Sequence, residues 1–538
     1  MLLGDSSFRW PIYAMYLCFI TSAPFAYGLS RQHLFSSSDK SEFANDVIFE
    51  SGAVHSPDNL IFNTVSSLLQ KWPNTRYRNG HTVVAAEVPV GTLLYHGTSK
   101  NEVPQSPEWV ATDPEHSFSF CRSLSTDSGC WHLTLMTTRP LKLLYFDGSS
   151  AAKMSEGVMD SQDLLIWDQV MPNKTWEEGE RIGRLCEWGQ QYALDGFLSE
   201  IMLCDFSRGV KISSFLNIIA ADNARHKSFF PDNPKNPQIY PLRLSTAYRL
   251  LESGTWHNHY PGETRIKLDY SRLISFYDTS LFPNLHSSRA GKDRRAHRLD
   301  KITTQEVNRF KARLDALLTQ GSSDPGNGLD WNSLQNVVVT RYAERLELLH
   351  YILSSANGNT DYNATLKQAH RQVSSMIAPY LLWSSLSNMP TTLGTNHDWA
   401  LPVYKQCSDA HTRDLEQFNL AISEQLIVKS INGVSKQICT ALVGIWAEGM
   451  VMGLDGPDIE LPSQQLTGTD FKTLVIWKNR VKGLMEWLDW SYWVRCNPAC
   501  GYEEMCYIPM WPFFLTEEEK TNPQPKCIRR VESFEFKT

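Results

Sequence analysis

The pattern of apolar residues changes near the middle of the chain. Over residues 46–286, apolar runs of strand length alternate with Gly, Pro, Asn and Asp, and a few helical stretches lie between them. Over residues 304–495, apolar residues recur with the period of amphipathic helices. Short runs bounded by turn residues are typical of strands, and sustained helical periodicity is typical of a bundle. We therefore predict an α+β N-terminal domain over 46–286 and an all-α helical domain over 304–495.

A length of 538 residues supports this division, because a chain of this size exceeds one ordinary hydrophobic core. The principal strands that we expect are His81–Val90, Leu93–Tyr95, Trp131–Met136, Leu141–Phe146 and Ile201–Phe206. The helices that we expect are Thr304–Thr319, Leu329–Ser355, Thr365–Ser387, Asp409–Met452 and Asp470–Trp493. In the fourth helix we predict a break at Asn432–Gly433.

A basic, polar stretch at residues 287–303 separates the two predicted domains. Its cations are Arg289, Lys292, Arg294, Arg295, Arg298 and Lys301. Charge runs of this kind are usually solvated, so we predict a linker here. A second interpretation is a dibasic processing site in an exported protein.

The N-terminal residues 1–28 have the pattern of an export signal. One cation, Arg9, precedes an apolar run from Pro11 to Tyr27, and small residues follow at a plausible cleavage site. An uncleaved signal anchor is the alternative, because the run is near the short limit for crossing a bilayer. Both interpretations predict a protein that is secreted or lies in the secretory-pathway lumen, in contact with a membrane only through this segment.

Cysteine usage favours an oxidising compartment. Without the Cys18 of the signal, an even number of ten cysteines remains, which suggests disulfides. Four of them, Cys496, Cys500, Cys506 and Cys527, lie in a predicted C-terminal cap over 496–538. Zinc is the alternative there, but the spacings are not those of a zinc knuckle or ribbon, so we expect no metal. The sequons at Asn173 and Asn363 predict a glycoprotein.

The most informative motif is Leu93-Leu-Tyr-His-Gly-Thr98, a strand that ends in a histidine and turns at a glycine. A second short strand follows at Trp109, and Thr112-Asp113-Pro114 then opens a helix, where Thr112 or Asp113 would cap. Phe120 comes eleven residues after Trp109. One aromatic on the strand and one on the helix would bracket a flat ring between them.

Residues 80–213 resemble the ADP-ribosyltransferase fold of the His-Tyr-Glu type, a split sheet that binds NAD. The resemblance assigns the ribose to His96, with Gly97 and Thr98 beside it, and the nicotinamide to Trp109 and Phe120. It also implies that Cys121 and Cys130, if bridged, would brace this pocket. Tryptophan replaces the family's first tyrosine, and phenylalanine lacks a hydroxyl, so both departures bear on catalysis.

The family's glutamate matches Glu200, which precedes an apolar strand. The resemblance implies that Glu200 stabilises the oxocarbenium character of the transition state. We therefore expect catalytic roles for His96 and Glu200, with NAD as the substrate and an unknown acceptor or water receiving ADP-ribose. Transfer to water would make the protein an NAD glycohydrolase.

A rival hypothesis is a catalytically inert secreted or wall-associated binding glycoprotein on the same fold. A carboxylate-pair hydrolase is a more distant one, because such pairs are frequent. A net charge of −7 gives no sign of nucleic-acid binding. Clustered tryptophans over Trp487–Trp493 leave room for a protein partner of the helical domain. The chain as a whole resembles large uncharacterised exported fungal proteins.

Overall fold

The computed structural model describes residues 56–530 except 119, 122–129, 199–200, 219–250, 320–326, 357–360, 388, 390–396, 456–467, 512–513 and 515. The predicted signal segment 1–28 and Glu200 therefore lie outside the described residues. The strands are β1 (Thr82–Val88), β2 (Leu93–Thr98), β3 (Glu108–Val110), β4 (Cys130–Thr137), β5 (Leu141–Phe146), β6 (Gly196–Leu198), β7 (Ile201–Leu203), β8 (Val210–Ile218), β9 (Lys267–Ser275), β10 (Glu504–Tyr507) and β11 (Lys526–Arg529).

The helices divide between the two parts of the chain. Those that accompany the strands are α1 (Asp58–Ser66), α2 (Lys71–Arg76), α3 (Pro114–Phe118), α4 (Asp160–Trp167), α5 (Glu178–Gly189), α7 (Pro283–Arg289) and the 3-10 turn η4 (Arg294–Ala296). Those that follow are α8 (Thr304–Thr319), α9 (Trp331–Ser354), α10 (Tyr362–Ile377), α11 (Trp383–Leu386), α12 (Leu401–Ser408), α13 (Ile422–Val451), α14 (Gly468–Leu488) and α15 (Glu517–Thr521). The predicted α+β region followed by a helical region is confirmed.

The larger sheet is buried on both faces. Its strand order is β3-β7-β6-β5-β1-β9, and every pairing is antiparallel except β5 with β6. Successive side chains of a strand point to opposite faces, so Val83 and Val84 of β1 enter two different hydrophobic clusters. This burial explains why β1 and β5 read as nearly continuous apolar runs.

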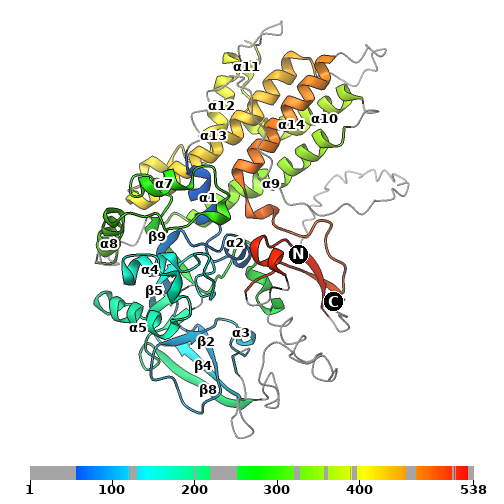
Figure 1. Ribbon diagram of the computed structural model, residues 1–538. Coiled ribbons are helices and arrows are strands. Elements are labelled where there is room, and N and C mark those ends of the chain that lie inside the picture. The colour runs from blue at the N-terminus through cyan, green and yellow to red at the C-terminus, as the bar shows by residue number, and fades with distance from the viewer. Residues whose placement is uncertain are drawn as a thin grey trace, which may run out of the picture. The chain divides into compact units, whose positions relative to one another are not determined.

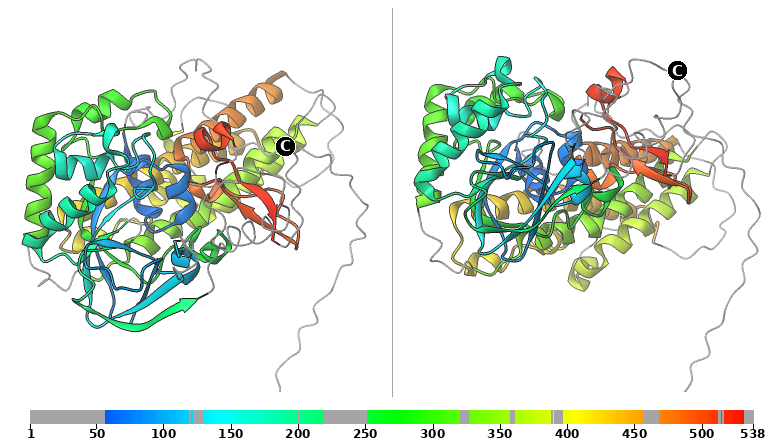
Figure 2. Two further views of the ribbon diagram at one scale, coloured as in Figure 1. Left: turned by 60° about the horizontal axis from the view of Figure 1, so that its bottom comes forward. Right: turned by 90° about the horizontal axis from the view of Figure 1, so that it is seen from below.

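Helices cover both faces of this sheet. The cluster that contains Val83 also includes apolar side chains of α4, α5 and α8, and these cyan and green helices lie together in both views of Figure 2. The cluster that contains Val84 includes side chains of α1, α9, α10, α12, α13 and α14. One continuous cluster therefore spans the predicted boundary between the sheet region and the helical region.

The helical region is built around α13, which contacts α1, α10, α12 and α14 (Figure 1). The predicted break at Asn432–Gly433 is wrong, because α13 is continuous from Ile422 to Val451. A Cβ on Gly433 would lie 2.2 Å from Asp58 Oδ2 of α1. The glycine therefore permits a close helix crossing rather than ending the helix.

The ten cysteines outside the signal form five disulfides, as the even count predicted. The pairs are Cys121–Cys130, Cys186–Cys204, Cys407–Cys439, Cys496–Cys506 and Cys500–Cys527. The last two hold the C-terminal cap, where β10 and β11 pair antiparallel. These thiols are therefore engaged in sulfur–sulfur bonds rather than offered to zinc.

The basic stretch 287–303 packs against the rest of the protein. Arg289 and His297 are each 5% exposed. Arg298 Nε lies 2.8 Å from Asp160 Oδ2 of α4. The expectation that this charge run is solvated is wrong for these side chains, because they serve as internal hydrogen-bond and ion-pair partners.

Among the residues that the structure describes, none of the helices combines the length and the apolar character that a membrane span requires.

The start of α10 provides a test of the helical region. The Asp361 side chain accepts hydrogen bonds from Asn363 N at 2.9 Å and Ala364 N at 3.2 Å. Replacing Asp361 with alanine should lower the free energy of unfolding by about 1 kcal/mol, because these helix-end donors lose their acceptor. Urea titration followed by circular dichroism measures this difference. An Asp361→Asn variant, which retains the cap oxygen, should stay within about 0.5 kcal/mol of the parent.

Candidate functional site

His96 lies where the two sheets meet. The smaller sheet has the order β2-β4-β8, and its edge strand β2 is joined to β3 of the larger sheet by two hydrogen bonds of 2.8 Å between Tyr95 and Ala111. His96 Nδ1 donates to Trp109 O at 2.8 Å. Since a carbonyl oxygen only accepts, this bond places the proton on Nδ1 and leaves Nε2 of a neutral ring as an acceptor.

Gly97 permits a helix to approach β2 closely. A Cβ at this position would lie 2.1 Å from Ser117 O of α3 and 3.0 Å from Cys121 N, so no larger residue fits without moving α3. The Cys121–Cys130 disulfide ties the chain after α3 to β4. Backbone groups along a strand alternate between its two edges. The backbone N–H and C=O of Tyr95 bond to Ala111, at the edge that faces β3. The N–H and C=O of Gly97, two residues further along β2, therefore point to the same edge.

Trp109 and Phe120 have different surroundings. Trp109 Nε1 donates to Glu178 Oε1 of α5 at 2.5 Å, and Glu178 also pairs with Lys153 at 2.6 Å. Phe120 is 56% exposed, and its ring centroid lies 5.8 Å from that of His116. The tryptophan is thus fixed to the sheet and α5, while the phenylalanine presents an open face to solvent.

The remaining predicted residues are placed only in part. Thr98 Oγ1 accepts a hydrogen bond from Lys100 N at 3.2 Å, which keeps its hydroxyl beside the end of β2. Glu200 lies outside the described residues. The strand that follows it, β7, pairs with β3 through Val110 and Ile201. The strands associated with His96, Trp109 and Glu200 are therefore adjacent in the order β2, β3, β7.

A serine and a histidine meet on the α3 side of β2, but not as a nucleophile and its base. Ser117 Oγ donates to Pro114 O at 2.9 Å and lies 2.7 Å from His132 Nε2. The hydroxyl proton is thus directed to the carbonyl, and the serine oxygen accepts from the imidazole. Burial lowers the pKa of His132. We interpret this pair as a brace between α3 and β4.

Sequence reasoning missed a charged cluster beside α3. Asp113, which precedes α3, lies 2.9 Å from Arg265 Nη2 and 3.2 Å from His257 Nε2. Arg265 also pairs with Glu263 at 2.6 Å. Burial would raise the pKa of Asp113, but the hydrogen bonds from His257 and Arg265 hold that pKa below its usual value. The guanidinium joins the two carboxylates, so the cluster is satisfied as an ion-pair network.

The chain is similar to two uncharacterised yeast proteins and matches one family model over part of its length. A family model described as the YPL277C N-terminal domain matches residues 56–131 and 125–233. The chain is 25% identical over 574 residues to the uncharacterized protein YOR389W of Saccharomyces cerevisiae, which covers 89% of this chain and 85% of that protein. It is 26% identical over 413 residues to the uncharacterized protein YPL277C of the same yeast, which covers 60% of this chain and 80% of that protein.

No solved structure matches the chain. The expected resemblance to uncharacterised fungal proteins is confirmed by these relatives. They lend no support to the expected ADP-ribosyltransferase-like fold, which stays a prediction from the motifs.

Proposed function

We propose that the edge formed by β2 and β3 binds NAD and that this exported protein transfers ADP-ribose to an acceptor or to water. The observation that carries the proposal is the bond from His96 Nδ1 to Trp109 O at 2.8 Å. It fixes an imidazole acceptor, Nε2, beside the end of β2. A ribose hydroxyl is a donor of the kind that such an acceptor binds.

Neighbouring groups suit the other end of the ligand. The backbone N–H and C=O of Gly97 point to the β3 edge and offer the donor and acceptor that a carboxamide requires. Trp109 and Phe120 supply aromatic faces for a pyridinium ring. We assign Glu200 the stabilisation of positive charge on the ribose. Its preorganised carboxylate would act mainly in the transition state.

The proposed reaction balances without a further co-reactant. The bond between the nicotinamide nitrogen and ribose C1′ breaks, and its electron pair neutralises the pyridinium. An acceptor hydroxyl, amine or water forms the new bond to C1′ and releases a proton. Five disulfides support the proposal that this chemistry operates after export.

Calorimetric titration of the oxidised mature protein with NAD tests binding. We expect saturable binding in the parent and a loss of at least about tenfold in affinity in His96→Ala, since a hydrogen bond of about 1.4 kcal/mol accounts for a factor of ten. His350→Ala on α9 is the matched control and should bind like the parent. Absence of binding at about 5 mM NAD would reject the proposal.

Turnover is tested by the release of nicotinamide. A Glu200→Gln variant should keep its NAD affinity within about threefold and lose release by about a hundredfold or more, because a transition-state contact affects the rate rather than binding. A specific observation favours an inert rival. The Trp109 indole is tied to Glu178 and takes the place of the family's tyrosine. Binding without nicotinamide release in the parent would select that rival.

A further inference from the structure

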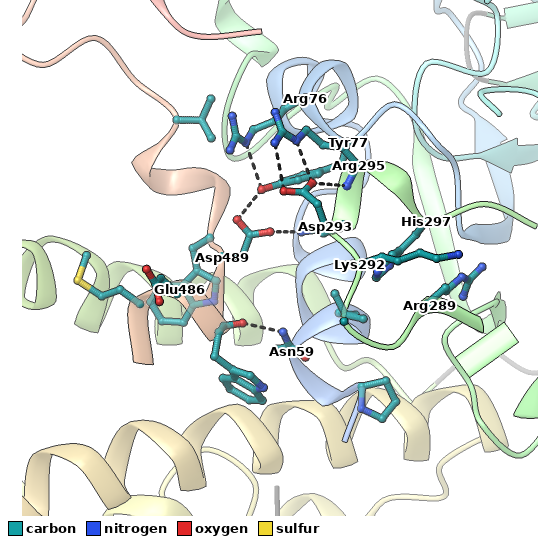
Figure 3. Close-up of a pocket in the computed structure, with 18 of the residues that line it drawn as sticks. Asn59, Arg76, Tyr77, Arg289, Lys292, Asp293, Arg295, His297, Glu486 and Asp489 are labelled. Atoms are coloured by element: carbon teal, nitrogen blue, oxygen red, sulfur yellow. Dashed lines mark hydrogen bonds and ion pairs between the residues drawn. The ribbon is translucent and has the colours of Figure 1, made fainter. Parts of the chain in front are cut away.

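A second candidate site lies between α1, α2, η4 and the end of α14, away from the β2–β3 edge. It is a cavity of about 430 Å³, and Figure 3 shows the labelled side chains around it. Small-molecule sites are typically concave and of this size. Five basic side chains line it, namely Arg76, Arg289, Lys292, Arg294 and Arg295, against three acidic ones, Asp293, Glu486 and Asp489.

Each of the three acidic side chains is already engaged by a cation, and for two of them that cation belongs to the cavity lining. Asp293 Oδ1 lies 2.9 Å from Arg295 Nε. Asp489 accepts a hydrogen bond from Tyr77 and lies 3.7 Å from Arg294. Glu486 pairs with Lys482 at 3.7 Å. These ion pairs use Arg294 and Arg295 of the cavity wall and Lys482 outside it.

Arg76 combines nearby carboxylates with one unsatisfied nitrogen. Burial would lower the pKa of its guanidinium, but Tyr77 and the carboxylates of Asp489 and Asp293 raise it. Arg76 is 7% exposed; its Nε donates to Tyr77 Oη at 3.1 Å, and its Nη1 has no hydrogen-bond partner in the described part of the chain. Arg289 is also buried, and donates to backbone carbonyls of Phe276 and Arg298. A buried guanidinium nitrogen without an acceptor is costly, so an oxyanion in the cavity that accepts from Arg76 Nη1 would stabilise this arrangement.

The remaining wall of the cavity is apolar and aromatic. This side is lined by Leu60 of α1, by Met485 and Trp487 of α14, and by Trp490, which follows α14. A free phosphate would fill only a small part of the space, since a single water takes up about 30 Å³. The ligand that fits therefore carries an organic body beside its charge. A tetrahedral oxyanion accepts in several directions, which suits cations that approach from both α2 and α7.

We propose that this cavity binds a small organic oxyanion, a phosphate or sulfate ester with a flat or apolar body. The binding is independent of the proposed NAD site, which it neither requires nor replaces. The positive lining contrasts with the net charge of −7 of the whole chain. The cations are therefore concentrated at this cavity and are not part of a generally basic surface.

Titration of the full oxidised protein with four naphthalene probes tests the proposal. These are 1-naphthyl phosphate, 1-naphthyl sulfate, 1-naphthoate and uncharged 1-naphthol. We expect saturable binding of at least one ester, with naphthol at least about tenfold weaker, because the charge supplies much of the affinity. The ratio of the two esters identifies the oxyanion. Absence of ester binding at about 5 mM, or equal binding of naphthol, would overturn the proposal.

Variants locate the site. Lys292→Gln changes an exposed side chain and should weaken the preferred ester by about threefold to tenfold, whereas Lys472→Gln, an exposed lysine of α14, should leave it unchanged. Arg76→Gln should weaken it by more than about tenfold. If Arg76→Gln fails to fold, Lys292→Gln decides, and equal affinities of the two lysine variants contradict the proposal. His96→Ala should retain ester binding, which separates this result from the NAD experiment.

Discussion

Replacing Arg181 with methionine should lower the free energy of unfolding by about 3–5 kcal/mol, because it leaves a buried carboxylate without its partner. Arg181 of α5 forms an ion pair with Asp163 of α4, and both side chains are 4% exposed. Arg181 also lies over the Trp167 ring at 4.8 Å. Burial already raises the pKa of Asp163 against the opposing effect of Arg181, so the variant will take up a proton there as it folds.

Urea unfolding at pH 7 measures this loss of stability. Two further variants test whether the loss comes from the unpaired buried charge. Arg184→Met removes an exposed cation of the same helix, which pairs with Glu180 at 2.9 Å, and should cost no more than about 0.5 kcal/mol. The double variant Arg181→Met with Asp163→Leu should recover most of the loss, because it leaves no unpaired charge. A double variant no more stable than Arg181→Met alone would contradict this account.

The fold class was predictable because the burial of each element leaves a periodic trace in sequence. The predicted helix Thr304–Thr319 coincides with α8. The predicted strand Leu141–Phe146 coincides with β5. Gly433 was misjudged because a glycine that ends a helix and a glycine that permits a close crossing look alike in one sequence. Only the position of Asp58, far away in the chain, distinguishes them.

The two candidate sites differ in how much of each was predictable. Apart from Glu200, the residues of the β2–β3 site follow one another within a short segment, so their order and spacing could suggest a strand and a helix around one ligand. The cavity is assembled from α1 and α2 near the start of the described chain, from η4 at residues 294–296 and from the end of α14 near residue 488, so its parts lie far apart in the sequence. Its one local signal was the basic stretch 287–303. Side-chain pattern alone does not show which cations of such a run are buried.

Stability should depend on pH through two buried groups that act in opposite directions. Burial, with Arg289 and Arg294 nearby, lowers the pKa of His297 from 6.5 to about 3. Between these values the unfolded state binds a proton and the folded state does not, so acidification favours unfolding. From pH 6.5 to 4.5 the loss from His297 is about 2 kcal/mol. The pKa of His81 is also lowered by burial, which adds a loss in the same direction.

Asp147 works against this loss. Burial raises its pKa from 3.8 to about 7, although the backbone N–H groups of Thr82 and His81 donate to its carboxylate. Between 3.8 and 7 the folded state binds a proton and the unfolded state does not, so acidification favours folding. The gain from pH 6.5 to 4.5 is about 2.5 kcal/mol. The change in the parent's free energy of unfolding with pH is therefore a small difference between larger opposing contributions.

Single variants should expose the two contributions. Relative to the parent, Asp147→Asn should lose about 2.5 kcal/mol more stability on going from pH 6.5 to 4.5, because the proton-linked gain is removed while an acceptor oxygen remains. His297→Gln should lose about 2 kcal/mol less over the same interval. Urea titrations at four pH values within this range measure both slopes. If the free energy of unfolding of the parent and of both variants changed in parallel with pH, neither group would have a different pKa in the folded and unfolded states. That result would contradict the assignment of the pH dependence to His297 and Asp147.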